Sequence, residues 1–153
     1  MNALDLSVPT VKNVAYLDRY RPCRTTGQRV SVIIPAHNEE AVIERTLRTL
    51  LHSADADEFE VFVVCNGCSD RTAEIVARGF ENVIVMETDE ASKTAAINAG
   101  LRVASGDSVL LLDADIDLDT DSARRLAKAA TQPGIEVAIG HMDVDTQGAD
   151  LFV

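Results

Sequence analysis

Apolar runs with the length of strands alternate with amphipathic segments along most of this chain. Five such runs and four segments with helical spacing follow one another between residues 30 and 139. The predicted strands are 30–34, 59–65, 83–86, 108–112 and 135–139, and the predicted helices are 39–53, 70–78, 92–104 and 120–130. Pro35 should end the first strand. The alternation predicts an α/β fold in which a mostly parallel sheet carries helices on both faces.

Two of the predicted helices have apolar faces that should pack against the sheet. The first helix places Ile43, Leu47, Leu50 and Leu51 on one side, and the third offers Ile97, Leu101 and Ala104. The 153 residues suffice for one domain with a sizeable core.

Basic residues are concentrated at the N-terminal end of this otherwise acidic chain. The net charge is −11, but residues 1–29 hold five Lys and Arg residues against two Asp residues, which leaves −14 for the rest. Because residues 1–29 also lack clear periodicity, we interpret them as an N-terminal arm before a single domain at 30–153. The acidic balance argues against a nucleic-acid partner.

The sequence contains no segment with the length and apolarity of a membrane span, and no signal-peptide pattern at its start. We therefore expect a cytoplasmic protein. In that compartment its three cysteines should be reduced.

The apolar run at 109–112 leads directly into two carboxylates, Asp113 and Asp115. We interpret the run as a buried strand, which places both carboxylates at its carboxyl end. Ligands bind at that edge of parallel sheets, and paired carboxylate oxygens with open positions suit Mg²⁺ or Mn²⁺. The segments 35–39, 65–70 and 87–89 bring further polar residues to the same edge.

The aspartates at 113, 115, 117, 119 and 121 also suggest a calcium-binding EF-hand loop. That alternative fails because the sixth position is Leu118 where Gly is needed, and the twelfth is Arg124 where Glu is needed. Helix capping explains the aspartates from 119 onward, but Asp113 and Asp115 come too early for it.

Cys65 and Cys68 form a Cys-x-x-Cys pair between a predicted strand and a predicted helix, as in a thiol redox protein. In such folds the pair usually follows the first strand, whereas here it follows the second. A zinc site would need a fourth ligand beyond these two and His37. The other alternative is a turn with two small thiols. We interpret His37, His52 and His141 as structural.

Asp70 and Lys93 lie where two of the predicted helices begin. Capping explains Asp70 best, although residues 70–72 could also bind phosphate. Lys93 opposes the helix dipole, so it is either a phosphate or base contact or a solvated lysine.

The segments 31–40, 63–72, 92–100 and 110–115 together resemble the family 2 glycosyltransferases in their order and spacing. The resemblance covers roughly residues 30–140. It implies an inverting enzyme with the GT-A fold, a Rossmann-like α/β architecture, and a nucleotide-sugar donor.

The resemblance also implies roles for individual residues. Pro35, Ala36 and Glu39 would line the nucleoside pocket, and Lys93 would lie near the nucleotide. Asn66 stands where the family often has an Asp that touches the base, so the charge at that position is absent here.

By the same resemblance, Asp113 would reach the ribose or sugar and Asp115 the divalent cation. Only 38 residues follow Asp115, whereas family members usually continue through an acceptor-binding half that carries the catalytic base. Asp143, Asp145 and Asp150 are available carboxylates in this tail, none in a recognisable motif. We therefore expect a truncated protein, a gene fragment, or a donor-binding half whose partner chain supplies the acceptor half.

The leading hypothesis is a domain that binds a nucleotide-diphosphate sugar and a divalent cation for inverting sugar transfer to an unknown acceptor. One alternative is a non-catalytic module that binds a nucleotide or a partner. A second alternative is a thiol redox protein that uses Cys65 and Cys68.

Overall fold

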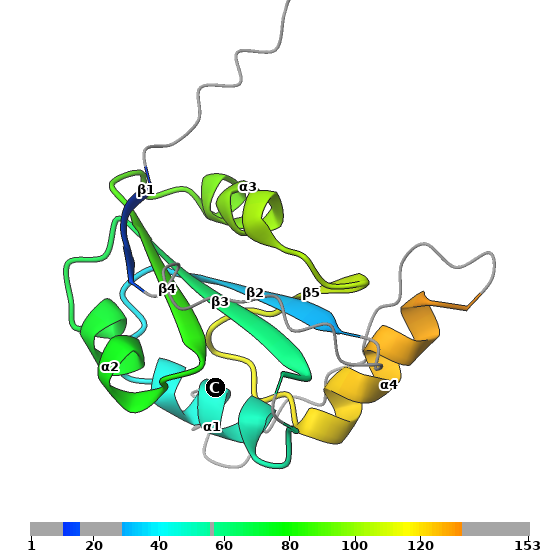
Figure 1. Cartoon of the computed structure of the whole chain (residues 1–153). Helices are drawn as coiled ribbons and strands as arrows, with labels where there is room; N and C mark the ends of the chain where they lie inside the picture. Colours follow the sequence, from blue (N-terminus) through cyan, green and yellow to red (C-terminus); the bar gives the residue numbers. More distant parts are fainter. Residues whose placement is uncertain (1–10, 16–28, 56, 133–153) are drawn as a thin grey trace, which may run out of the picture.

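The computed structural model describes residues 11–15, 29–55 and 57–132, and within these segments the chain forms a five-stranded sheet. The strand order is β1-β4-β3-β2-β5, and the strands are β1 (Val11–Ala15), β2 (Val30–Ala36), β3 (Phe59–Asn66), β4 (Val83–Thr88) and β5 (Ser108–Leu111). β2 to β5 are parallel to one another, and β1 pairs antiparallel with β4 at one edge (Figure 1). The predicted mostly parallel sheet is confirmed.

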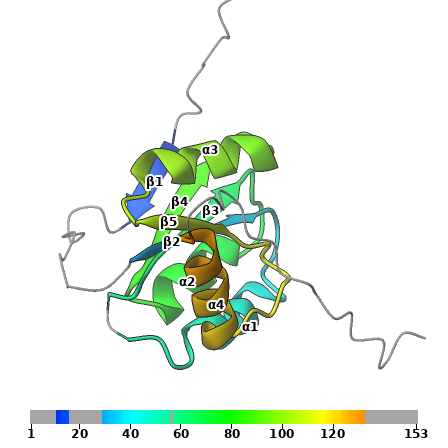
Figure 2. The ribbon, with the colours of Figure 1, turned by 90° about the vertical axis from the view of Figure 1, so that its right-hand side faces the viewer.

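Helices cover both faces of this sheet, as predicted. α1 (Ile43–Leu51), α2 (Thr72–Gly79) and α4 (Thr120–Ala130) lie on one face, and α3 (Lys93–Val103) lies on the other (Figures 1 and 2). α1 and α2 begin four and two residues later than predicted, so the residues before them are loop residues at the carboxyl edge of the sheet. The strand predicted at 135–139 lies outside the described residues.

The prediction that Pro35 ends the first strand is wrong, because β2 continues to Ala36. The amide of Leu112 donates to the carbonyl of Ile33 (3.1 Å), so the backbone of Ile33 faces the β5 side. Pro35 lies two residues further on and faces the same side. Its β5 neighbour has already ended at Leu111. The missing N–H of Pro35 therefore breaks no ladder bond, and the pairing with β3 continues.

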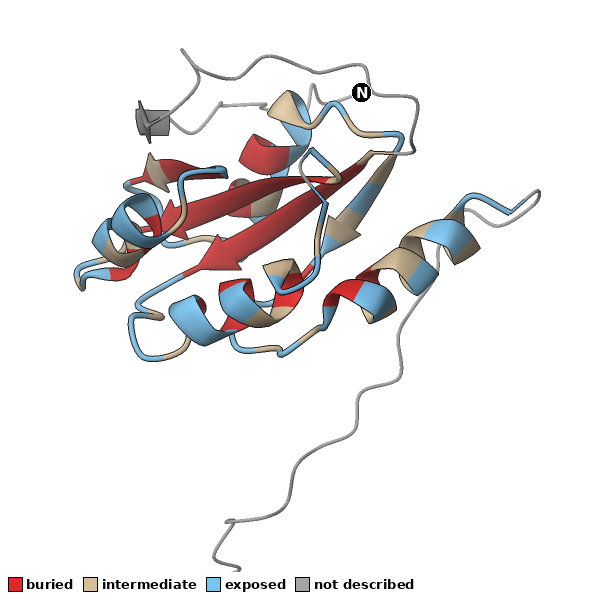
Figure 3. Cartoon of the chain, turned by 60° about the horizontal axis from the view of Figure 1, so that its bottom comes forward, coloured by how far each residue is buried: buried red, intermediate tan, exposed pale blue. Residues whose placement is uncertain are grey.

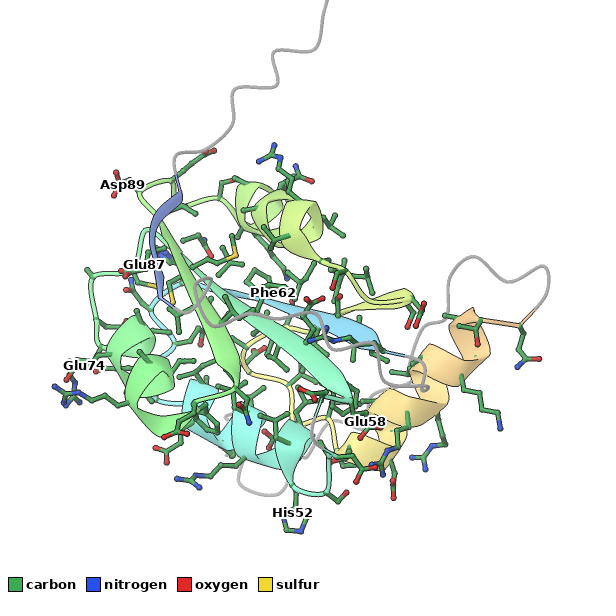
Figure 4. The ribbon with its side chains drawn as sticks, in the orientation of Figure 1. His52, Glu58, Phe62, Glu74, Glu87 and Asp89 are labelled. Atoms are coloured by element: carbon green, nitrogen blue, oxygen red, sulfur yellow. The ribbon has the colours of Figure 1, made fainter. Side chains whose placement is uncertain are left out.

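Buried side chains form one apolar cluster on each face of the sheet. The central strands β2 and β3 are buried over their whole length (Figure 3). On the α1 face, Ile43, Leu47 and Leu50 are fully buried as predicted, and Leu51 is partly buried. On the opposite face, Phe62 lies between the sheet and α3 (Figure 4).

The inward face predicted for α3 is wrong for Leu101, which is 44% exposed. The buried residues of the helix are Ala96, Ala99 and Gly100, and Ala104, directly after it, is partly buried against the same apolar cluster as predicted. A Cβ on Gly100 would lie 2.7 Å from Cγ2 of Ile33 in β2. α3 therefore lies too close to the sheet for Ile or Leu at the contact, and it packs through its small residues.

The interpretation of residues 109–112 as a buried strand is also wrong for one of its faces. β5 is the edge strand of the sheet that the structure describes, and Val109 and Leu111 are 43% and 52% exposed. Both residues point to the α3 side, because they pair with Ser31 and Ile33. Leu112, directly after the strand, is buried on the α1 side.

β1 is a strand that the sequence analysis did not predict within the N-terminal arm. Its pairing with β4 shifts register between Lys12 and Val14, so apolar residues do not alternate cleanly along it. Among the described helices, none combines the length and the apolarity that crossing a membrane requires.

Candidate functional site

A pocket of about 240 Å³ opens at the carboxyl edge of the sheet, where the ends of β2 and β3, the start of α3 and the segment after β5 meet. It is lined by Pro35, His37, Glu39, Asn66, Lys93, Asp113, Ala114 and Asp115. Six of the seven residues that the sequence analysis assigned to a site are thus brought together. The seventh, Ala36, is 1% exposed and packs in the core behind the pocket.

Asp113 and Asp115 point outward because their neighbours anchor the segment between them. Leu112 and Ala114 are buried in the α1-face cluster, and alternation along the chain therefore exposes both carboxylates. The hydroxyl of Thr46 on α1 donates to the carbonyl oxygen of Ala114 at 2.7 Å. This arrangement presents two carboxylates to the pocket from a fixed backbone.

The later aspartates have other partners, which disposes of the EF-hand alternative. Asp117 pairs with Arg45, and Asp121 pairs with Arg124. Asp119 caps α4 by accepting the amide of Ser122 at 2.8 Å, as the sequence predicted. The pKa of Asp119 is lowered chiefly by that backbone hydrogen bond.

Lys93 is the first residue of α3 and reaches across the pocket. Ser92 caps the helix by accepting the amide of Ala95, which fixes the point where α3 begins. The Lys93 Nζ lies 2.6 Å from Oδ1 of Asp113, and the two side chains are 60% and 52% exposed. The ammonium thus neutralises one carboxylate of the pocket.

The loops after β2 and β3 are tied together by Asp70. Its carboxylate accepts the amide of Thr72 and the amide of Glu40, both at 3.0 Å. Desolvation raises the pKa of Asp70, but a hydrogen bond from the hydroxyl of Thr72, together with these two, outweighs it and leaves the pKa below its usual value. The hydroxyl of Thr72 in turn accepts the amide of Glu39 at 2.9 Å. Asp70 lies one residue before the N-cap position of α2, Arg71, and satisfies the amide of the first helical residue without occupying the cap position itself.

His37 lines the pocket, although the sequence analysis interpreted it as structural. Its Nδ1 lies 2.6 Å from the carbonyl oxygen of Asn66, so Nδ1 carries the proton and donates. Asn38 follows with a left-handed backbone (φ +57°), and its side chain accepts the amide of Ser69. The position of His37 between Pro35 and Glu39 was the signal that could have identified it.

Neither Cys65 nor Cys68 lines the pocket. Burial raises the pKa of the Cys65 thiol strongly, and Cys65 is only 1% exposed. Cys68 donates to the carbonyl of Ala36 at 3.3 Å. A redox pair needs an accessible thiol with a lowered pKa, so this geometry argues against the redox alternative and for two structural thiols.

Asp115 is the residue best placed to hold a cation. Its carboxylate makes no hydrogen bond or ion pair with any residue that the structure describes. Within the same part of the chain, no three His, Cys, Asp or Glu side chains are grouped closely enough to hold a metal ion by themselves. One or two carboxylates fit Mg²⁺ or Mn²⁺ when substrate phosphates supply the remaining ligands.

The model of glycosyl transferase family 2 matches residues 31–152 of this chain. A curated relative, the undecaprenyl-phosphate 4-deoxy-4-formamido-L-arabinose transferase of Edwardsiella ictaluri, is 34% identical over 129 residues, which cover 80% of this chain and 39% of the relative. The chain spans between 22% and 39% of the length of eight such curated relatives.

Two solved structures share the fold. The mannosyltransferase PcManGT from Pyrobaculum calidifontis, in complex with GDP-Man and Mn²⁺, is 32% identical with a TM-score of 0.65, over 71% of this chain and 34% of that chain. TarS 1-349 of S. aureus, in complex with UDP, is 28% identical with a TM-score of 0.61, over 67% of this chain and 32% of that chain.

Proposed function

This chain belongs to glycosyl transferase family 2, and from that premise we propose that its pocket binds the nucleotide-sugar donor of a sugar-transfer reaction. The observation that carries the proposal is the meeting of Lys93, Asp113 and Asp115 in one pocket at the carboxyl edge of a parallel sheet. One cation and two carboxylates suit a ligand with both phosphate and hydroxyl groups. The complexes of PcManGT with GDP-Man and Mn²⁺ and of TarS with UDP support this assignment.

The β2 and β3 side of the pocket would hold the nucleoside. Pro35 and Glu39 lie on its wall, whereas Ala36 is buried in the core. Asn66 is 4% exposed and also lines the pocket. Its neutral amide can both donate to a base and accept from it, whereas an Asp could only accept.

The β5 side would hold the diphosphate and the sugar. Lys93 would contact the phosphates, and Asp113 would accept a hydroxyl of the ribose or of the sugar. Asp115 would hold Mn²⁺ or Mg²⁺, because its carboxylate has no partner among the described residues. When bound, such an ion neutralises the charge that develops on the departing diphosphate.

Inverting transfer also requires an acceptor hydroxyl and a base that removes its proton. We assign neither to the described residues. The tail carboxylates Asp143, Asp145 and Asp150 lie outside them. The role proposed for the described part of the chain is therefore donor binding.

Calorimetric titration with UDP-, GDP- and TDP-sugars, with and without Mn²⁺, tests the proposal. We expect at least one donor to bind, and to bind more tightly with Mn²⁺. Asp115→Asn should abolish the gain from Mn²⁺. Asp117→Asn is the matched control, because Asp117 is exposed, pairs with Arg45 and does not line the pocket.

Absence of binding by every donor, or a gain from Mn²⁺ that survives Asp115→Asn, would contradict the proposal. Donor hydrolysis or sugar transfer distinguishes a transferase from a non-catalytic binding module. Both reactions are measured by the release of the nucleoside diphosphate. Binding without either reaction would favour the module.

A further inference from the structure

We propose that Lys93 is a built-in counter-ion of Asp113 that a nucleoside diphosphate displaces, so that a divalent cation binds this pocket firmly only together with the nucleotide. The inference rests on the function proposed above. It concerns how the chain's own charges regulate metal binding at that site.

The ion pair between Lys93 and Asp113 is close but exposed. The Nζ lies 2.6 Å from Oδ1, while 60% of the Lys93 side chain and 52% of the Asp113 side chain remain accessible to water. Ion pairs this exposed contribute little net stability, because water screens the attraction. The pair therefore neutralises Asp113 without locking it, and a ligand of higher charge can replace Asp113 as the partner of Lys93.

Asp115 alone is a weak site for a divalent cation. No group of three potential metal-binding side chains occurs in the described segments. The nearby Asp113 is already paired, and the Lys93 ammonium repels a second cation at the same edge of the pocket. Hard cations held by so few carboxylates take most of their ligands from water and from substrate phosphates.

A nucleoside diphosphate changes this balance of charge. Its phosphates offer the ammonium of Lys93 a stronger anionic partner than a single carboxylate does. The flexible stem of lysine allows Nζ to turn from Asp113 to the phosphates. Asp113 is then released to accept a hydroxyl of the ligand or to join Asp115, and the phosphates supply further oxygen ligands. Nucleotide and metal therefore bind with positive, reciprocal coupling.

The decisive measurement is the affinity for Mn²⁺ in the absence of any nucleotide. Electron paramagnetic resonance of the free ion monitors the binding. Lys93→Gln removes the ammonium and frees Asp113, so we expect this variant to bind Mn²⁺ about fivefold more tightly than the wild type. That factor corresponds to the removal of one unit charge a few ångströms away in water. Lys128→Gln is the matched control, because it removes the same charge from an exposed position on α4 outside the pocket.

A second substitution and a second ligand test the mechanism behind that gain. Adding Asp113→Asn to Lys93→Gln should cancel the gain in Mn²⁺ affinity, because the released carboxylate is then gone. Lys93→Gln should weaken UDP or GDP binding in the presence of Mn²⁺ about tenfold, the opposite direction. Thermal unfolding followed by circular dichroism should be unchanged in these variants, since both side chains are exposed.

The inference is overturned if Lys93→Gln does not raise Mn²⁺ affinity above that of Lys128→Gln, or if the gain persists in the double variant. Those measurements are made without nucleotide, so they can contradict this inference without contradicting the proposed function. Failure of the wild type to bind any nucleotide would instead contradict the proposed function.

Discussion

The hydroxyl of Thr46 donates a 2.7 Å hydrogen bond to the carbonyl oxygen of Ala114, the residue between Asp113 and Asp115. Thr46 lies on α1 and is 0% exposed, and Ala114 is 3% exposed. The bond joins a helix that follows β2 to the turn that follows β5. The two carboxylates of the pocket are therefore positioned by a residue 68 positions away that does not line the pocket.

Replacing Thr46 with valine should lower the free energy of unfolding by about 1–3 kcal/mol, because it leaves the buried carbonyl of Ala114 without its donor. We also expect weaker Mn²⁺-dependent nucleotide binding, since the turn is no longer held. Thr49→Val is the matched control, because Thr49 lies one turn further along α1, is half-buried and bonds only to the carbonyl of Arg45. Urea unfolding and calorimetry of both variants provide the comparison, and equal effects would contradict a special role for Thr46.

The small-residue contact of α3 leads to a second prediction. Gly100→Ala should lower the free energy of unfolding by about 1–3 kcal/mol, because the new Cβ would lie 2.7 Å from Cγ2 of Ile33. Gly79→Ala places the same methyl at the end of α2, where no atom lies within 4 Å. That control should be neutral or stabilising by up to about 1 kcal/mol. Urea unfolding curves distinguish the two, and a neutral Gly100→Ala would show that α3 can shift away from the sheet.

The sequence predicted the features that depend on local pattern. Alternating segments identified β2 to β5 and the four helices, and the spacing of Ile43, Leu47 and Leu50 identified the inner face of α1. Glu39, Asp113 and Asp115 line the pocket and follow strands that end at one edge of the sheet, and parallel strands bring such residues together.

The features that failed depend on which element lies beside which. The continuation of β2 through Pro35 depends on β5 having ended beside it. The inward face of α3 depends on how closely that helix approaches Ile33, and the exposure of Leu111 depends on β5 being an edge strand. The hydrogen bond from Thr46 to Ala114 links two segments that are far apart in the chain, so no local sequence pattern predicts it.

Alkylation of cysteines separates structural thiols from a redox pair. At pH 8, we expect iodoacetamide to modify Cys65 at least about tenfold more slowly than Cys68 in the native protein, because burial raises the pKa of Cys65 and excludes the reagent. Mass spectrometry of the digested protein identifies each modified residue. The denatured chain is the control, in which both thiols should react at similar rates. Rapid modification of native Cys65 would revive the redox alternative.

The ion pair between Glu58 and Arg124, away from the pocket, makes the stability of the fold depend on pH. Glu58 precedes β3 and lies close to α4 (Figure 4). Its two oxygens accept hydrogen bonds of 2.6 and 2.8 Å from Nε and a terminal guanidinium nitrogen of Arg124. These bonds, partly opposed by desolvation, lower the pKa of Glu58 from its usual value of 4.5. The pair fastens α4 to the loop between α1 and β3.

Because folding lowers the pKa of Glu58, its contribution to stability is fully present above pH 4.5 and is lost as the pH falls through the folded-state pKa. Glu58→Gln should therefore cost about 1 kcal/mol at pH 7 and progressively less below pH 4.5, where the wild-type carboxyl also becomes neutral. Urea unfolding at a series of pH values measures the difference. Glu81→Gln, at an exposed position, should show no such pH dependence. If the loss in free energy of unfolding caused by Glu58→Gln stays constant down to pH 3, the contact is stabilised by the packing of the side chain and not by its charge.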